Sequence, residues 1–197
     1  MGERMILITN DDGIRSAGLR AAVQAVSRLG EVLIVAPNRQ WSGSGRSMPS
    51  SVSGDVKETV LELEGERYGA YEIDATPALC VIYAMMGLAD RQPDLVVSGI
   101  NFGENISIDI TISGTIGAAL EAAAFGIPAL AVSVEMSVEN HLTGDAPLAH
   151  ADSIALEGLV SVTVCLASRT RPEDQLLAFD QADLNDVIAE TLTDEGD

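Results

Sequence analysis

The sequence has little cysteine and histidine, with two residues of each among 197. A disulfide framework, or a zinc centre built on sulfur and imidazole, needs more of both, so these classes of protein are excluded. Cys80 and Cys165 lie in apolar stretches, and we expect them to be buried thiols. The apolar run near the N-terminus, residues 5–8, is too short for a signal-peptide core or a membrane span. We therefore expect a cytoplasmic protein.

Positive charge is also scarce. Lys57 is the only lysine, and 30 acidic residues against 11 basic ones give a net charge of -19. A surface of that sign repels phosphate backbones and anionic lipids, so we expect neither a nucleic-acid polymer nor a membrane as a partner. Residues 1–50 differ from the rest of the chain, because six arginines stand against four acidic residues there. A small anion would be attracted to this quarter of the sequence.

Apolar periodicity predicts an α/β fold with a mostly parallel sheet. Because 47% of the residues are hydrophobic, the chain can bury one core, and we expect a single domain over residues 1–197. Continuous apolar runs at 5–9 and 32–36 predict buried strands that flank a helix capped by Ser16. Further strands are predicted at 56–63 and 68–73, as an antiparallel hairpin, and at 94–98, 129–134 and 159–166. Further helices are predicted from Thr76 to residue 86, from Ser113 to residue 125 and at 183–192.

Three polar loops follow predicted strands, at residues 10–13, 40–47 and 100–115. In an open parallel sheet, ligands bind beyond the carboxyl ends of the strands, where loops converge and helix N-termini present free amides. We therefore expect these three loops to form one ligand site.

Asp11 and Asp12 are adjacent carboxylates at the end of the first predicted strand. Two neighbouring negative charges repel and raise one pKa, and a divalent cation would relieve that repulsion. Ser42 and Asn101 offer neutral oxygens from the other two loops, and such a set of oxygens suits Mg²⁺ or Mn²⁺. The alternative interpretation is that the two aspartates only cap the following helix and favour its dipole.

The other polar residues of these loops also have two interpretations. The Ser-Gly-Thr sequence at 113–115 is either an anion cradle of amides and two hydroxyls or an ordinary helix cap. The loop at 40–47, which we call the serine loop, contains Ser42. Arg39 and Arg46 lie on either side of Ser42, and they either capture phosphate or lie in solvent. Trp41, the only tryptophan, either stacks on a base or anchors the loop.

Several short segments occur together in a fixed order. They are residues 5–13 (MILITNDDG), 35–37 (VAP), 42–45 (SGSG), 76–80 (TPALC), 97–101 (VSGIN) and 113–117 (SGTIG). Each segment alone is common, but the ordered set is specific. In identity, order and spacing, it resembles the SurE (survival protein E) 5'/3'-nucleotidase family over about residues 4–134.

The resemblance implies a Rossmann-like, three-layer α/β/α fold and metal-dependent hydrolysis of nucleoside 5'- or 3'-monophosphates to nucleoside and phosphate. It implies one divalent ion, Mg²⁺ or Mn²⁺, held by Asp11, Asp12, Ser42 and Asn101. One of the two aspartates would also be catalytic and accept the proton of the attacking water. The phosphate of the substrate would contact Asn10, Ser113, Gly114 and Thr115.

The chain also departs from the family pattern. Leu79 stands where the family usually has aspartate, and residues 140–197 resemble a diverged or truncated C-terminal part. Since the family's C-terminal elements build its oligomers, the sequence supports a homodimer better than a higher oligomer. Two other functions stay open: a nucleotide-binding module without catalytic activity, and an acid phosphatase indifferent to the base.

Overall fold

The computed structural model of the chain describes residues 4–103, 105, 107–134 and 160–165. All of these residues belong to one compact unit, Met1–Ala167. The helix predicted at 183–192 lies outside the described residues, and a single domain over the whole chain stays a prediction. Within the described part of the chain, every helix is too short or too polar to cross a membrane.

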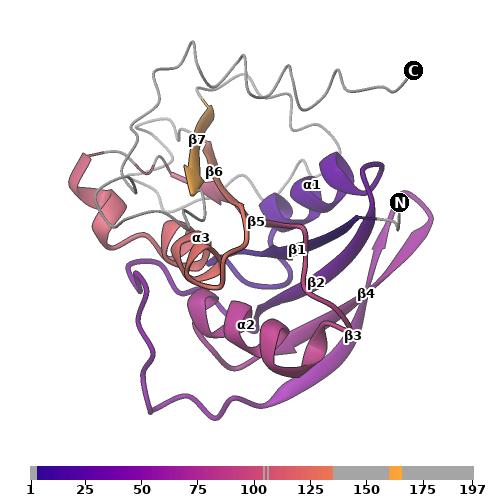
Figure 1. Cartoon of the computed structure of the whole chain (residues 1–197), viewed down its shortest axis with the longest axis horizontal. Coiled ribbons are helices and arrows are strands. Elements are labelled where there is room, and N and C mark those ends of the chain that lie inside the picture. The colour runs from indigo at the N-terminus through magenta and orange to yellow at the C-terminus, as the bar shows by residue number, and fades with distance from the viewer. Residues whose placement is uncertain (1–3, 104, 106, 135–159, 166–197) are drawn as a thin grey trace. The chain divides into compact units, whose positions relative to one another are not determined.

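The described strands form a seven-stranded sheet in the order β3-β4-β2-β1-β5-β6-β7 (Figure 1). Their bounds are β1 Met5–Thr9, β2 Glu31–Pro37, β3 Val56–Leu63, β4 Glu66–Ile73, β5 Leu95–Phe102, β6 Ala129–Val134 and β7 Val160–Cys165. Two neighbouring pairs, β3 with β4 and β6 with β7, are antiparallel, and the other four pairs are parallel. Because β2 and β5 lie on opposite sides of β1, the strand order reverses at β1, which is where open α/β sheets bind ligands.

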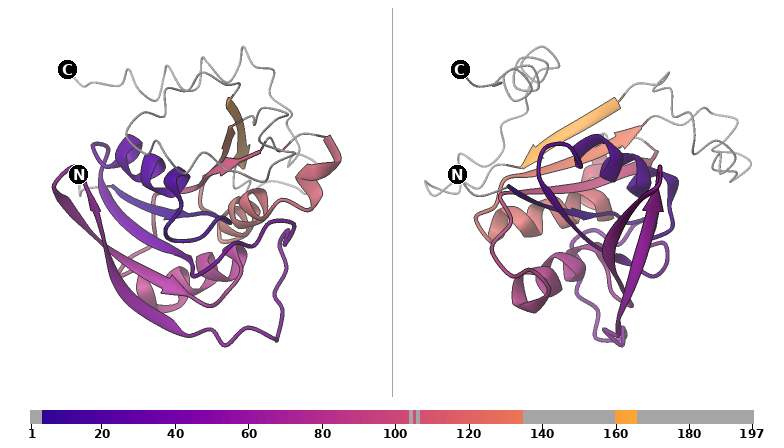
Figure 2. Two further views of the ribbon diagram at one scale, coloured as in Figure 1. Left: turned by 180° about the vertical axis from the view of Figure 1, so that it is seen from behind. Right: turned by 90° about the vertical axis from the view of Figure 1, so that its right-hand side faces the viewer.

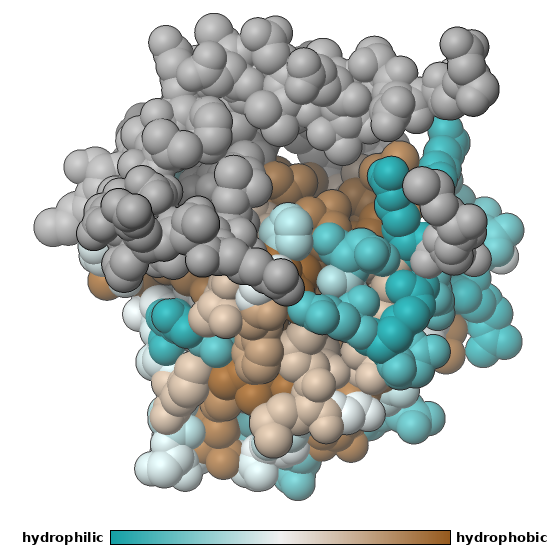
Figure 3. All heavy atoms as spheres, in the orientation of Figure 1, coloured by the Kyte–Doolittle hydropathy of each residue, from teal (hydrophilic) through white to brown (hydrophobic). Residues whose placement is uncertain are grey.

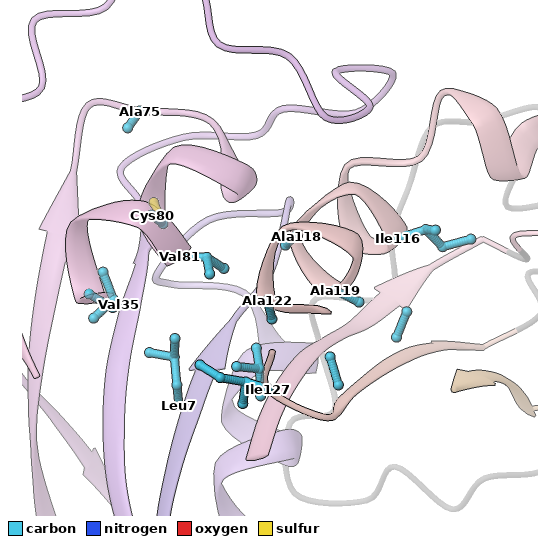
Figure 4. Close-up of a cluster of buried hydrophobic side chains, with 14 of the residues drawn as sticks. Leu7, Val35, Ala75, Cys80, Val81, Ile116, Ala118, Ala119, Ala122 and Ile127 are labelled. Atoms are coloured by element: carbon cyan, nitrogen blue, oxygen red, sulfur yellow. The ribbon is translucent and has the colours of Figure 1, made fainter. Parts of the chain in front are cut away.

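Helices cover both faces of this sheet (Figure 2). They are α1 Ala17–Val26, α2 Pro77–Tyr83 and α3 Gly114–Ala124, with a π-helical turn η1 at Ala84–Leu88 and a 3-10 turn η2 at Ser107–Thr111. Alternate side chains of β1 enter two separate cores: Ile6 and Ile8 pack with α1, and Leu7 packs with α2 and α3. Figure 4 shows the second core, in which Val81 and Ala122 approach Leu7. The predicted three-layer, Rossmann-like α/β/α fold is confirmed.

The helix starts were predictable because their caps are local. Ser16, Thr76 and Ser113 each accept a hydrogen bond from a backbone N–H three residues later, at the beginning of α1, α2 and α3. The predicted antiparallel hairpin is also confirmed by the pairing of β3 with β4.

Two predicted boundaries were wrong. We expected β5 to end at residue 98 and a loop to begin there, but β5 continues to Phe102 because a bulge lets Asn101 and Phe102 pair with β6. The loop expected at residues 100–115 also contains η2. We expected the helix from Thr76 to reach residue 86, but the α-helix ends at Tyr83 and the chain continues as the π-helical turn η1.

The side chains on the surface are unevenly distributed. On the face shown in Figure 3, apolar residues gather over α2 and α3. Among the described residues, the exposed large hydrophobic side chains include Met86 of η1, Leu120 of α3 and Phe125 directly after α3. Cys80 is fully buried in α2, as expected, and burial raises the pKa of its thiol far above the usual value. The thiol is therefore an inert part of the core.

Candidate functional site

The three polar loops meet at the carboxyl ends of β1, β2 and β5, as predicted. The backbone N–H of Trp41, in the loop after β2, donates to the carbonyl oxygen of Asp11 at 2.7 Å. The backbone of Phe102, at the end of β5, forms a hydrogen bond to the carboxylate of Asp12. Residues 10–12 thus contact both of the other loops directly.

Asp11 is the most enclosed acidic group of this site, with 3% of its surface exposed. The Thr115 hydroxyl, in the first turn of α3, donates to Oδ1 of Asp11 at 2.6 Å. Burial raises the pKa of Asp11, while hydrogen bonds from the side chain and backbone of Thr115 lower it. Thr115 therefore helps to keep a buried carboxylate in its charged form.

Asp12 is less enclosed, and its pKa is raised to about 6. Burial is the main cause, and the adjacent charge of Asp11 is the second, while hydrogen bonds from Phe102 and Gln40 act in the opposite direction. Its Oδ2 atom is buried and has no hydrogen-bond partner among the described residues. The geometry thus provides a carboxylate oxygen that is free to bind a cation or to accept a proton.

Gln40 connects Asp12 to Ser42, although the sequence did not single it out. Its Nε2 atom donates to the Ser42 hydroxyl oxygen at 3.0 Å and lies 3.4 Å from Oδ1 of Asp12. Asn101 precedes Phe102 in β5, and its Nδ2 atom donates to the carbonyl oxygen of Gly103 at 2.7 Å. The side-chain oxygen of Asn101 is therefore the atom that could serve as a metal ligand.

Buried polar atoms without a hydrogen-bond partner mark the same region. Among the described residues they are Thr9 Oγ1, Asn10 Oδ1, Asp12 Oδ2, Trp41 Nε1, Ser44 Oγ and Ser98 Oγ. All six belong to the end of β1, to the loop after β1, to the loop after β2 or to β5. Thr9 of β1 and Ser98 of β5 are neighbours in register. Leaving such a group unpaired costs about 1–3 kcal/mol, so a cluster of them is typical of a binding site rather than of a core.

The residues expected to bind phosphate are mostly engaged with other protein groups. Asn10 donates from Nδ2 to the Gly13 carbonyl at 3.1 Å and to the Ser16 hydroxyl at 2.7 Å. Ser113 caps α3 by accepting from the Ile116 N–H at 3.2 Å, and the Thr115 hydroxyl is bound to Asp11. Of the two proposed hydroxyls, only that of Ser113 keeps a hydrogen available for a ligand.

Gly114 lies where two of the loops approach the start of α3 closely. A Cβ atom at this position would stand 2.8 Å from the Cβ atom of Asp11 and 2.8 Å from the hydroxyl oxygen of Ser44. Such contacts are too short, so the first residue of α3 must be glycine for both loops to reach it. The N-terminus of α3 therefore faces the carboxylates and the serine loop together.

The two arginines of the serine loop contact protein groups. Arg46 forms an ion pair with Glu121 of α3, with 2.5 Å between Nε and Oε2. The guanidinium of Arg39 lies 4.3 Å from the centre of the Trp41 ring and 3.8 Å from Asp74. One face of the indole thus packs on Arg39, while the backbone of Trp41 anchors the loop to Asp11.

Comparisons with known proteins identify several similar chains. The family model described as survival protein SurE matches residues 6–188 of the chain. A protein of Methanopyrus kandleri named 5'-nucleotidase SurE is 55% identical over 131 residues, which cover 66% of this chain and 49% of that protein. The 5'-nucleotidase SurE of Thermococcus kodakarensis is 40% identical over 185 residues, which cover 87% of this chain and 70% of that protein.

Among solved structures, the crystal structure of the SurE protein from Aquifex aeolicus is similar, with a TM-score of 0.50 and 38% identity. The match covers 64% of this chain and 48% of the Aquifex chain. The chain spans about half the length of the curated relatives it matches.

Proposed function

Because this chain belongs to the survival protein SurE family, we propose that it hydrolyses nucleoside monophosphates to nucleoside and phosphate with the help of one divalent metal ion. The observation that carries the proposal is the pair of buried carboxylates, Asp11 and Asp12, at the point where the strand order reverses. Two such groups beside each other need a compensating positive charge when both are ionised.

The residues present fit a hard divalent ion such as Mg²⁺ or Mn²⁺. Asp12 has a buried, unpartnered oxygen, and Gln40 connects the other oxygen of Asp12 to the neutral Ser42 hydroxyl. The described residues contain no group of three or more histidine, cysteine or acidic side chains, so an ion here would need serine and amide oxygens as well. The proposed ligands are Asp11, Asp12, Ser42 and Asn101. When bound, the ion would supply positive charge that polarises the phosphate ester.

Asp12 is our candidate for the group that accepts the proton of the attacking water. Its Oδ2 atom is buried and has no hydrogen-bond partner among the described residues, so this oxygen is free to accept a proton. Asp11 is less suited to this role, because Thr115 binds its Oδ1 atom at 2.6 Å. At the start of α3, Gly114 and Ser113 would stabilise the negative charge that develops on the phosphate oxygens.

A panel of nucleoside 5'- and 3'-monophosphates, assayed for phosphate release with Mn²⁺ and again with EDTA, tests the proposal. We expect release with Mn²⁺, little with EDTA, and at least a hundredfold loss in Asp12→Asn, a loss within the range general-base catalysis supplies, about 10²–10⁴. Glu58→Gln is the matched control, since it removes one exposed carboxylate from β3. Absence of release from every nucleotide would contradict the proposal.

Substrate selectivity separates a nucleotidase from a general phosphatase. An enzyme that recognises the base should prefer AMP strongly over p-nitrophenyl phosphate, whereas an acid phosphatase would cleave both at similar rates. The panel of 5'- and 3'-monophosphates determines from which position of the sugar the phosphate is released.

A nucleotide-binding module without catalytic activity is the second candidate. It is favoured by Leu79, which packs partly buried against the core of α2 and α3 where the family usually has aspartate. This candidate predicts that calorimetry detects AMP binding while no phosphate is released.

A further inference from the structure

The serine loop contains a second serine, Ser44, that sequence reasoning did not select. Its hydroxyl oxygen is buried and has no hydrogen-bond partner among the described residues. The backbone around it is nonetheless well fixed, because its N–H donates to Trp41 and its carbonyl accepts from Ser47, both at 3.1 Å. A buried hydroxyl without a partner, on a turn that is held in place, is free to bind a ligand.

Ser44 lies at the positive end of α3. A Cβ atom on Gly114 would stand 2.8 Å from the Ser44 hydroxyl and 3.0 Å from Oδ2 of Asp11, so the hydroxyl and the carboxylate flank the first residue of the helix. The N-terminus of a helix of this length attracts anions through its free N–H groups.

Two other hydroxyls lie at this end of α3. The Thr115 hydroxyl donates to Asp11, whereas the Ser113 oxygen accepts from Ile116 and keeps its hydrogen for a ligand. Ser44 is therefore the hydroxyl at this helix end that makes no hydrogen bond to the described protein.

Three contacts hold Ser44 in this position. The N–H of Gly45 donates to the carbonyl of Ile112 at 2.7 Å, and Gly117 of α3 lies so close to Gly45 that a Cβ would collide with its backbone. Arg46 then forms the ion pair with Glu121, which is only 5% exposed. A buried carboxylate needs its partner, so this pair fixes the loop against α3.

We propose that Ser44 is a phosphate-binding residue of this site, and that Arg46 and Glu121 are the positioning pair that presents it. The Ser44 hydroxyl donates its hydrogen to an oxygen of the substrate or product phosphate. The identity of the ligand as phosphate rests on the proposed function, while the unpaired hydroxyl and its position do not.

The test compares Ser44→Ala with Ser47→Ala, which removes an exposed hydroxyl from the same loop. Binding of inorganic phosphate to the full chain is measured by calorimetry with Mn²⁺ present, and KM and kcat are measured with AMP. We expect Ser44→Ala to weaken phosphate binding and raise KM about tenfold, since hydrogen bonds to charged groups are the stronger ones, while kcat changes less. Ser47→Ala should resemble the wild type.

Thermal unfolding without phosphate separates binding from a structural role. A hydroxyl that only supports the loop would lower the melting temperature when removed, whereas an unpaired hydroxyl can be removed without loss. A lower melting temperature of Ser44→Ala, or phosphate affinity and KM equal to those of the wild type, would overturn the proposal for Ser44 alone. A wild-type protein that neither binds phosphate nor releases it from AMP would overturn the proposed function as well.

Discussion

The hydroxyl of Thr115, in the first turn of α3, donates a 2.6 Å hydrogen bond to Oδ1 of Asp11, which lies 104 residues earlier at the end of β1. The bond joins the helix proposed to face the phosphate to the carboxylate proposed to hold the metal. It also makes Thr115 part of the support for Asp11 rather than a free ligand for the substrate.

Replacing Thr115 with valine should therefore destabilise the protein. Thr115→Val keeps the shape of the side chain but leaves a buried carboxylate with one donor fewer, and we expect the free energy of unfolding near neutral pH to fall by about 1–3 kcal/mol. Thr115→Ser restores the hydroxyl and should recover most of the loss. Urea denaturation of the three proteins measures the effect, and equal stability would show that the bond contributes nothing.

Stability without metal should decrease as the pH rises. The pKa of Asp12 is 3.8 in the unfolded chain and about 6 in the folded one, so between these values the folded state binds more protons than the unfolded state. The free energy of unfolding then falls as the pH rises through this window, by about 2–3 kcal/mol for a shift of this size. The raised pKa of Asp11 acts in the same direction.

Asp12→Asn should weaken this pH dependence and make the metal-free protein more stable near neutral pH, because the neutral amide avoids the burial of a charge. Denaturation of both proteins in the presence of EDTA, at several pH values within this window, measures both effects on the free energy of unfolding. Glu58→Gln removes an exposed charge and controls for general repulsion in a chain with net charge -19. A profile of Asp12→Asn that parallels the wild type would refute the assignment of the pH dependence to Asp12.

Breaking the Arg46–Glu121 ion pair should loosen the serine loop. Arg46→Met leaves Glu121 buried without its cation, and we expect a loss of about 1–3 kcal/mol, less than for a fully buried pair because Arg46 is half exposed. The double variant Arg46→Met, Glu121→Leu should regain stability. Since Trp41 is the only tryptophan, acrylamide quenching of its fluorescence reports the loop directly, and it should increase in Arg46→Met. Unchanged quenching would mean that the pair does not restrain the loop.

Gly114→Ala should damage the site without damaging the helix. Alanine favours helix, but its Cβ would stand 2.8 Å from both Asp11 and Ser44, so these groups must move apart. We expect at least a tenfold loss of phosphate release, as small displacements of reacting groups cause losses of about 10²-fold. Gly69→Ala in β4 is the control, because open space surrounds that position. Equal activity of Gly114→Ala and the wild type would contradict the close approach.

The sequence predicted those features that depend on neighbouring residues. Ser16, Thr76 and Ser113 identify the helix starts because a cap acts within three residues. The meeting of the three loops was predictable because the carboxyl ends of parallel strands share one edge of the sheet.

Features that depend on distant partners were not predictable. The glycines around residues 99–103 indicate a loop, but pairing of Phe102 with Val134 makes this segment a strand. Likewise, the sequence predicts Thr115 to be an anion ligand, and only the fold shows that its hydroxyl binds Asp11. Gln40 and Ser44 have no feature in the sequence that distinguishes them from other loop residues. Their roles follow from contacts between elements that the sequence alone does not position.

Binding of Mn²⁺ tests most directly whether the oxygens at the ends of β1, β2 and β5 share one cation. Electron paramagnetic resonance of free Mn²⁺, titrated with the full chain, should show one bound ion per chain for the wild type and at least tenfold weaker binding for Asp12→Asn, which keeps one of the two charges. Glu58→Gln should bind as the wild type does. Wild-type protein that binds no Mn²⁺, or binds it equally well without the Asp12 carboxylate, would contradict the account.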